Sequence, residues 1–219
     1  MVYAQAGQGI PAATAAACIF HVLVLRALTS SEPSPAHPVA LTATIYHFAI
    51  ELADVDRGVY ESLALKVAQH PSETAERLVT RVLAYCLEHA EGIAFSRGIS
   101  EPDEPAITIR DLTGTITSWI EVGAPDAARL HKASKASPRV VVYIEKLPVI
   151  YLRQLAGEKI HRAESIAVLA IDRELIAQLV AKLDRRMTIA LSVTDGHLFI
   201  SIGATSMDGS VERHAITPA

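Results

Sequence analysis

The segment Arg139 to Glu145 constrains the fold most, because its interior, Val-Val-Val-Tyr-Ile, is an unbroken apolar run. A strand with one face in water alternates apolar and polar side chains, whereas a strand covered on both faces stays apolar along its length. The run therefore predicts a strand at the centre of a sheet that is buried on both faces.

Patterns on either side of this strand alternate between strand and helix. Short runs rich in β-formers and bounded by turn residues predict strands, and apolar residues at helical spacing predict helices. The mixture predicts an α/β fold with a mixed β-sheet flanked by helices. The expected order is strands over 42–55 and 59–69, a helix from Pro71-Ser72 to Glu91-Gly92, strands at 93–95 and on each side of Asp111–Gly114, a helix over 125–137, the central strand, a helix over 150–161, a strand over 166–171, a helix over 173–183, a hairpin turning at Asp195-Gly196, and a last strand over 211–216.

The first of these helices carries the clearest local signals. Ser72 is its expected N-cap, and Glu73 and Glu76 fall in its first turn, where the helix dipole favours carboxylates. The apolar side chains that follow recur at helical spacing and predict its buried stripe. That stripe comprises Leu78, Val79, Val82, Leu83 and Cys86.

Residues 1–38 differ in texture from the rest of the chain. They are Ala-rich and then Ser- and Pro-rich up to Pro38, and the apolar run from Ala12 to Leu28 is shorter than a membrane span of about 20 residues. A signal peptide would need a basic start, which this run lacks. We expect an N-terminal extension outside the folded domain, a single domain over 39–219, and no membrane segment.

Composition limits the function classes. Half of the 219 residues are hydrophobic, which is enough for a packed core, and the formal net charge is −4. An acidic chain has no general attraction for phosphate backbones, so any contact with nucleic acid would have to be local. Two cysteines, Cys18 and Cys86, support neither a disulfide framework nor a zinc site, and fit a reducing cytoplasm.

The hairpin expected around Asp111–Gly114 places carboxylates together. If these four residues form the turn, the facing pairs are Arg110 with Thr115, Thr108 with Thr117, Ala106 with Trp119, and Glu104 with Glu121. Opposed glutamates repel unless a cation, a proton or a metal relieves the repulsion, and Mg²⁺ prefers oxygen ligands. The pair could be a metal site for phosphodiester chemistry. The alternative, which spacing alone favours, is a strand end in water.

Several short segments, in order and at their spacing, resemble the bacterial YaeQ family. The resemblance runs from about Val39 to the C-terminus and is looser in the last third. The matching segments are Ala43-Thr44-Ile45-Tyr46, His70-Pro71-Ser72-Glu73-Thr74, Glu76-Arg77, Arg81, Asp103-Glu104-Pro105, Asp111-Leu112-Thr113-Gly114, Trp119-Ile120-Glu121-Val122-Gly123, Lys132-Ala133 and Val140-Val141-Val142-Tyr143.

The resemblance implies a restriction-endonuclease-like fold, a variant of the PD-(D/E)xK nuclease core. In such nucleases, acids on a helix and on two strands gather around a metal together with a lysine. The resemblance assigns Glu73 or Glu76 as the helix acid, Pro102-Asp103 as the PD pair, and Glu121-Val122-Gly123 in place of the acid–x–lysine triplet. Strand parity places Glu104, rather than Asp103, on the face of Glu121. Mg²⁺ or Mn²⁺ would be the metal.

Gly123 departs from this pattern, because glycine cannot supply the amine that orients the attacking water. Lys132, or Lys135 one turn further on, could reach back from the following helix. The alternative, favoured for Lys135, is that both lysines lie on a solvated helix face. Arg77 and Arg81, spaced i, i+4, could meet phosphate or pair with carboxylates such as Glu73.

Two function hypotheses follow. The first is a metal-dependent nuclease acting on a phosphodiester. Its metal ligands would be Glu104, Glu121 and Asp103, supported by Glu73 or Glu76, and Lys132 would act with Glu104 and Glu121 in catalysis. The alternative is a non-catalytic module that binds nucleic acid or a protein partner on the same scaffold. The carboxylates favour the first, and Gly123 and the acidic net charge favour the second.

Overall fold

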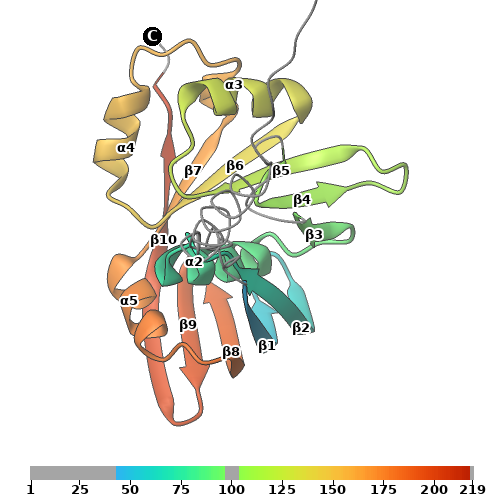
Figure 1. Ribbon diagram of the computed structural model, residues 1–219, viewed down its shortest axis with the longest axis vertical. Coiled ribbons are helices and arrows are strands. Elements are labelled where there is room, and N and C mark those ends of the chain that lie inside the picture. Colours follow the sequence, from blue (N-terminus) through green and yellow to red (C-terminus); the bar gives the residue numbers. More distant parts are fainter. Residues whose placement is uncertain (1–42, 97–103, 218–219) are drawn as a thin grey trace, which may run out of the picture. The chain divides into compact units, whose positions relative to one another are not determined.

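The computed structural model describes residues 43–96 and 104–217. Its strands join in one mixed sheet in the order β2-β1-β8-β9-β10-β7-β6-β5-β4-β3, with β1 parallel to β8 and with β5, β6 and β7 mutually parallel. Figure 1 shows these strands and the helices around them. The strands are β1 (Thr44–Asp54), β2 (Val59–Gln69), β3 (Ile93–Phe95), β4 (Ile107–Arg110), β5 (Ile116–Val122), β6 (Arg139–Ile144), β7 (Ala167–Ile171), β8 (Arg186–Thr194), β9 (His197–Ile202) and β10 (Thr205–Ala215).

Helices cover both faces of the parallel part of the sheet. One core cluster joins α2 (Ala75–Leu87) and α5 (Arg173–Ala181) to β1, β8 and β9 and to one face of β5, β6 and β7. A second cluster packs α3 (Ala127–Ala136) and α4 (Pro148–Leu155) on the opposite face of β5, β6 and β7. A short 3₁₀ turn, Ala163–Ser165, precedes β7. The predicted α/β fold with a mixed sheet flanked by helices is confirmed.

Strand β6 is the buried centre that its apolar run predicted. All of its residues except Arg139 are buried. Val141 and Tyr143 belong to the cluster under α2, while Val140 and Val142 belong to the cluster under α3 and α4. Because successive strand side chains point to opposite faces, both faces of this strand need apolar residues.

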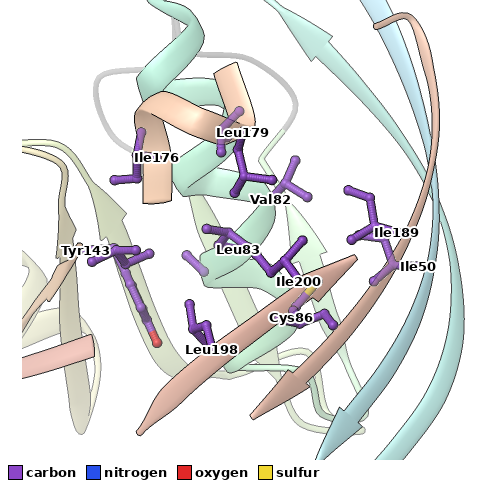
Figure 2. Close-up of a cluster of buried hydrophobic side chains, with 14 of the residues drawn as sticks. Ile50, Val82, Leu83, Cys86, Tyr143, Ile176, Leu179, Ile189, Leu198 and Ile200 are labelled. Atoms are coloured by element: carbon purple, nitrogen blue, oxygen red, sulfur yellow. The ribbon is translucent and has the colours of Figure 1, made fainter. Parts of the chain in front are cut away.

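The larger core forms where α2 meets the curved part of the sheet. The predicted stripe of α2 is buried throughout, and Val82, Leu83 and Cys86 lie within this core. Figure 2 shows these side chains converging with Ile176 and Leu179 of α5 and with residues of β1, β8 and β9. Each fully buried aliphatic side chain of this kind contributes about 1.5–3 kcal/mol. Helix α2 is therefore held in place along most of its length.

The start of α2 differs from the prediction. Its N-cap is Thr74, whose side chain accepts a hydrogen bond from the Arg77 backbone N–H, and not Ser72. The Ser72 hydroxyl instead lies 2.6 Å from His70 Nδ1. Glu73 consequently lies outside the helix, while Glu76 remains in its first turn.

Other local predictions hold with two changes of extent. The β1–β2 hairpin is present, and Asp195 and Gly196 both have the positive φ that a type I′ turn requires. The predicted helix over 150–161 spans only Pro148–Leu155, because Ala156 is extended and Gly157 has φ +83°. The last strand starts at Thr205, well before the predicted residue 211, since Gly203 turns the chain after β9.

The predicted register of the β4–β5 hairpin is wrong by two residues. Thr108 faces Trp119 and Ile107 faces Ile120, so the same register would set Ala106, and not Glu104, opposite Glu121. One residue of the shift arises at the turn, where the Asp111 N–H bonds the Thr115 carbonyl. The other arises at an irregularity between Ile109 and Arg110.

The predicted extension over 1–38 lies outside the described residues, so the proposed domain boundary stays a prediction. Among the helices that the structure describes, none has the length and apolar character to cross a membrane.

Candidate functional site

A pocket of about 210 Å³ opens beyond the carboxyl end of β5. The carboxyl ends of parallel strands are where open α/β sheets commonly bind ligands. Helix α2, the end of β5 and the start of α3 supply charged side chains to it. We call it the arginine pocket, because Arg77, Arg81 and Arg129 line it together with Glu104 and Glu121.

Glu121 is held by two partners inside the arginine pocket. Its side chain is 3% exposed, and one carboxylate oxygen accepts hydrogen bonds from Trp119 Nε1 and Arg129 Nε, each at 2.7 Å. The other oxygen accepts from the Arg129 guanidinium at 3.2 Å. Arg129 also donates to the Glu104 backbone carbonyl at 2.8 Å. The negative charge of Glu121 is thus balanced by an ion pair with Arg129.

Glu73 is neutralised in the same manner. The Arg81 guanidinium donates to both carboxylate oxygens, at 3.1 and 2.8 Å, and also to the Ala68 carbonyl at 2.8 Å. Burial raises the pKa of the Glu73 carboxyl, and Arg81 acts against that rise. The sequence left open whether Arg77 and Arg81 meet phosphate or pair with Glu73. Arg81 pairs with Glu73.

Arg77 differs from Arg81, because its guanidinium makes no hydrogen bond or ion pair with residues 43–96 and 104–217 and acts on Glu73 and Arg81 only through its charge. It lies against Gly123, whose φ is +96°, and a Cβ placed on Gly123 would fall 2.3 Å from the Arg77 guanidinium nitrogen. Glycine at position 123 therefore leaves room for a cation from α2. The guanidinium of Arg77 thus occupies the space that a side chain at position 123 would fill.

The remaining predicted residues are spread out. Glu104 lines the arginine pocket and is half-buried, and its carboxylate makes no hydrogen bond with any described residue. Glu76, Lys132 and Lys135 are exposed and do not line the pocket. Asp103 lies outside the described residues.

A divalent metal fits these side chains poorly. In the part of the chain that the structure describes, no group of three or more His, Cys, Asp or Glu residues could hold a metal ion. The carboxylates of Glu73 and Glu121 are each bonded to an arginine, which a metal would have to displace. The assigned metal and catalytic roles of these residues stay a proposal.

Arg129 is a residue of the arginine pocket that sequence reasoning missed. It lies in the first turn of α3, after the N-cap Asp126, whose side chain accepts from the Arg129 backbone N–H at 2.8 Å. A usable signal existed, because a helix that follows directly on a strand returns its first turn to that strand's carboxyl end. A basic residue in that turn can therefore reach an acid at the end of the strand.

The fold and the pocket define an α/β protein with a curved mixed sheet and paired acids and arginines at the end of a parallel strand. The model of the YaeQ protein family matches residues 39–211. The chain therefore belongs to the YaeQ family.

Relatives and solved structures agree with this assignment. "Uncharacterized protein YaeQ" of Salmonella typhi is 34% identical over 172 residues, covering 78% of this chain and 94% of the relative. The protein of that name from Escherichia coli K12 is 34% identical over 165 residues, covering 74% and 91%. The crystal structure of YaeQ protein from Xanthomonas axonopodis pv. citri has a TM-score of 0.73 at 32% identity and covers 80% of this chain and 100% of that one. The structure from Pseudomonas syringae has a TM-score of 0.70 at 30% identity, covering 78% and 95%.

Proposed function

We propose that the protein binds a nucleotide unit, free or at an accessible position of a nucleic acid, through the phosphate group and without cleaving it. The scaffold would be a variant of the PD-(D/E)xK nuclease core. The order α2, β4, β5, α3, β6 supports this, since it is the helix, strands, helix and strand order expected of such a core.

The observation that carries the proposal is the guanidinium of Arg77. It lies in the arginine pocket with no hydrogen bond or ion pair to the described residues, while Arg81 and Arg129 are bonded to Glu73 and Glu121. A guanidinium presents a planar fork of donors that matches phosphate, and it keeps its charge at any physiological pH. A phosphate would supply the acceptors that Arg77 lacks.

Glu104 supports a nucleotide over inorganic phosphate. Its carboxylate lines the same pocket without a described partner, and a carboxylate accepts hydrogen bonds but donates none. A phosphate alone would be repelled by it. A nucleotide carries both a phosphate for Arg77 and hydroxyl or amino donors for Glu104.

The metal-dependent nuclease reading has less support. The register places Ala106 and not Glu104 level with Glu121, and Lys132 is exposed and away from the pocket lining. Two of the acids that would hold Mg²⁺ or Mn²⁺, Glu73 and Glu121, are already hydrogen-bonded to arginines. Binding without cleavage therefore agrees better with the observed contacts.

Binding can be tested by titrating the protein with inorganic phosphate, a mononucleotide, a single-stranded oligonucleotide and a duplex. We expect Arg77→Gln to weaken nucleotide binding by roughly tenfold or more, as for loss of a hydrogen bond between charged groups. Arg153→Gln, which removes the same charge from an exposed site on α4, is the matched control. Glu104→Gln should weaken the binding of the nucleotide, whose donors Glu104 would accept. It should leave the weak binding of inorganic phosphate unchanged or make it stronger. Equal affinity in wild type and Arg77→Gln would refute the proposal.

Cleavage is tested separately with single-stranded, duplex and branched substrates in Mg²⁺ and in Mn²⁺. We expect no cleavage by the wild type, and no rise in its unfolding temperature at millimolar ion. Cleavage by the wild type that Glu121→Gln and Lys132→Ala both abolish, with their folds intact, would establish the nuclease reading instead. Equal weak cleavage by all three proteins would identify a contaminant.

A further inference from the structure

A second, larger cavity of about 560 Å³ lies at the other end of α2. Leu87 at the end of the helix lines it, whereas the arginine pocket lies near Arg77, about 15 Å earlier along the helix axis. We call it the α2-end cavity. Its other walls come from the β1–β2 and β8–β9 turns and from β4, β6, β7 and β10.

Apolar side chains form much of its lining. Leu87, Ile109, Leu169 and Val211 are each only partly buried and face this space from four different elements. Apolar surface that stays in contact with water is available to a ligand, and covering it is favourable by about 25 cal/mol per Å². A cavity of this size is within the range of small-molecule sites.

The acids of the α2-end cavity are already satisfied by the protein. Asp54 accepts from Arg57, with Nε at 2.6 Å, and the carboxylate of Asp56 accepts from the Asp195 and Gly196 backbone N–H groups at 2.7 and 2.8 Å. These contacts fix the two turns beside each other. They leave neither carboxylate in need of a cation.

The third acid, Glu88, is buried and lies at the centre of a hydrogen-bond network. It accepts from the Arg139 guanidinium at 2.6 and 3.0 Å and from the Tyr143 hydroxyl at 3.0 Å. Burial and the adjacent Glu88 carboxylate raise the pKa of Tyr143 well above its ordinary value, so the hydroxyl stays protonated and donates. The Glu88 wall is therefore fixed before any ligand arrives.

Arg213 is the cation in the cavity lining that takes no part in these contacts. It pairs with Leu169 across β10 and β7, so the two side chains share the face that lines the cavity. Its guanidinium has no hydrogen bond or ion pair to any residue in the described ranges. The α2-end cavity thus combines an apolar floor with one unengaged positive charge.

We infer that the α2-end cavity is a second ligand site, for a small organic carboxylate with an apolar body. The carboxylate pairs with Arg213 and the body covers Leu87, Leu169 and Val211. This site is separate from the arginine pocket and does not depend on nucleotide binding there.

The probe is anilinonaphthalene sulfonate, which has an apolar body and one anionic group and reports binding by fluorescence. We expect octanoate to displace it, and acetate and octanol, which lack the body or the charge, to fail at the same concentration. Arg213→Gln should weaken octanoate binding by roughly tenfold. Arg173→Gln on α5, exposed and outside the cavity, removes the same charge and should leave binding unchanged.

Three results would overturn this inference. The first is equal octanoate affinity in Arg213→Gln and wild type, with both folded by circular dichroism. The second is octanol competing as well as octanoate, which would show that the charge is irrelevant. The third is loss of binding in Arg77→Gln, which would place the probe in the arginine pocket. If nucleotide binding fails while octanoate binding passes these tests, only the first proposal falls.

Discussion

Replacing Arg129 by methionine tests whether the Arg129–Glu121 pair belongs to the framework of the pocket. The substitution keeps much of the apolar stem but leaves a carboxylate that is 3% exposed, with Trp119 as its remaining hydrogen-bond donor among the described residues. Breaking a buried pair in this way costs about 3–5 kcal/mol. Arg129 itself is 28% exposed and water can enter the pocket beside it, so we expect the lower end, about 3 kcal/mol. For a domain of this size that lowers the unfolding temperature by roughly 6–12 °C.

The assay is a double-mutant cycle in urea at pH 7. Glu121→Gln alone should cost less than Arg129→Met, because the amide oxygen can still accept from Trp119 and the charge left behind, on Arg129, is the more exposed of the two. The double variant should be more stable than the sum of the two single losses predicts, by roughly 1–3 kcal/mol. A cost below about 1 kcal/mol for Arg129→Met, or strictly additive losses, would show that the pair is solvated and would refute this reasoning.

Three further outcomes are expected. Deleting residues 1–38 should leave the unfolding temperature of the domain unchanged, and a large loss of stability or solubility would contradict the predicted boundary. Gly123→Ala should lower stability by about 1–3 kcal/mol, because φ is +96° and the new methyl group meets Arg77, and it should weaken phosphate binding; urea denaturation and titration measure both. The pKa of Tyr143 is raised in the folded state. Its contribution to the free energy of unfolding is therefore fully present below the pKa of about 10 that tyrosine has in the unfolded chain, and it is lost as the pH rises above that value. Tyr143→Phe should flatten this decline in stability between about pH 9 and 11.

Local features of the fold were predictable because they depend on neighbours in sequence. The β1–β2 hairpin, the stripe of α2, the buried β6 and the turn at Asp195-Gly196 all follow from periodicity or from turn chemistry, and all are present. The predicted N-cap of α2 was wrong by two residues, because serine and threonine are both good N-cap residues and the sequence has Ser72 and Thr74. In the folded chain Ser72 contacts His70, and Thr74 caps the helix.

The register of the β4–β5 hairpin was not predictable from its turn. Asp111 does form the turn, with its carboxylate accepting from the backbone of Thr113 and Thr115. An irregularity next to Arg110 then adds a residue that no local signal indicates. A two-residue shift keeps each side chain on its face but changes every partner. The face of Glu121 could therefore be predicted, and its neighbour could not.

The sequence by itself determined the class of fold, the family and the presence of an acid, Glu121, near the end of β5. Which acid meets which arginine was decided only by tertiary structure, because Glu73–Arg81 and Glu121–Arg129 are pairs across elements whose orientations depend on packing around α2 and α3. The same packing brings Arg77 against Gly123 and leaves it without a described partner. A glycine in the sequence marks the absence of a side chain, whereas only the packed structure specifies which group occupies the space.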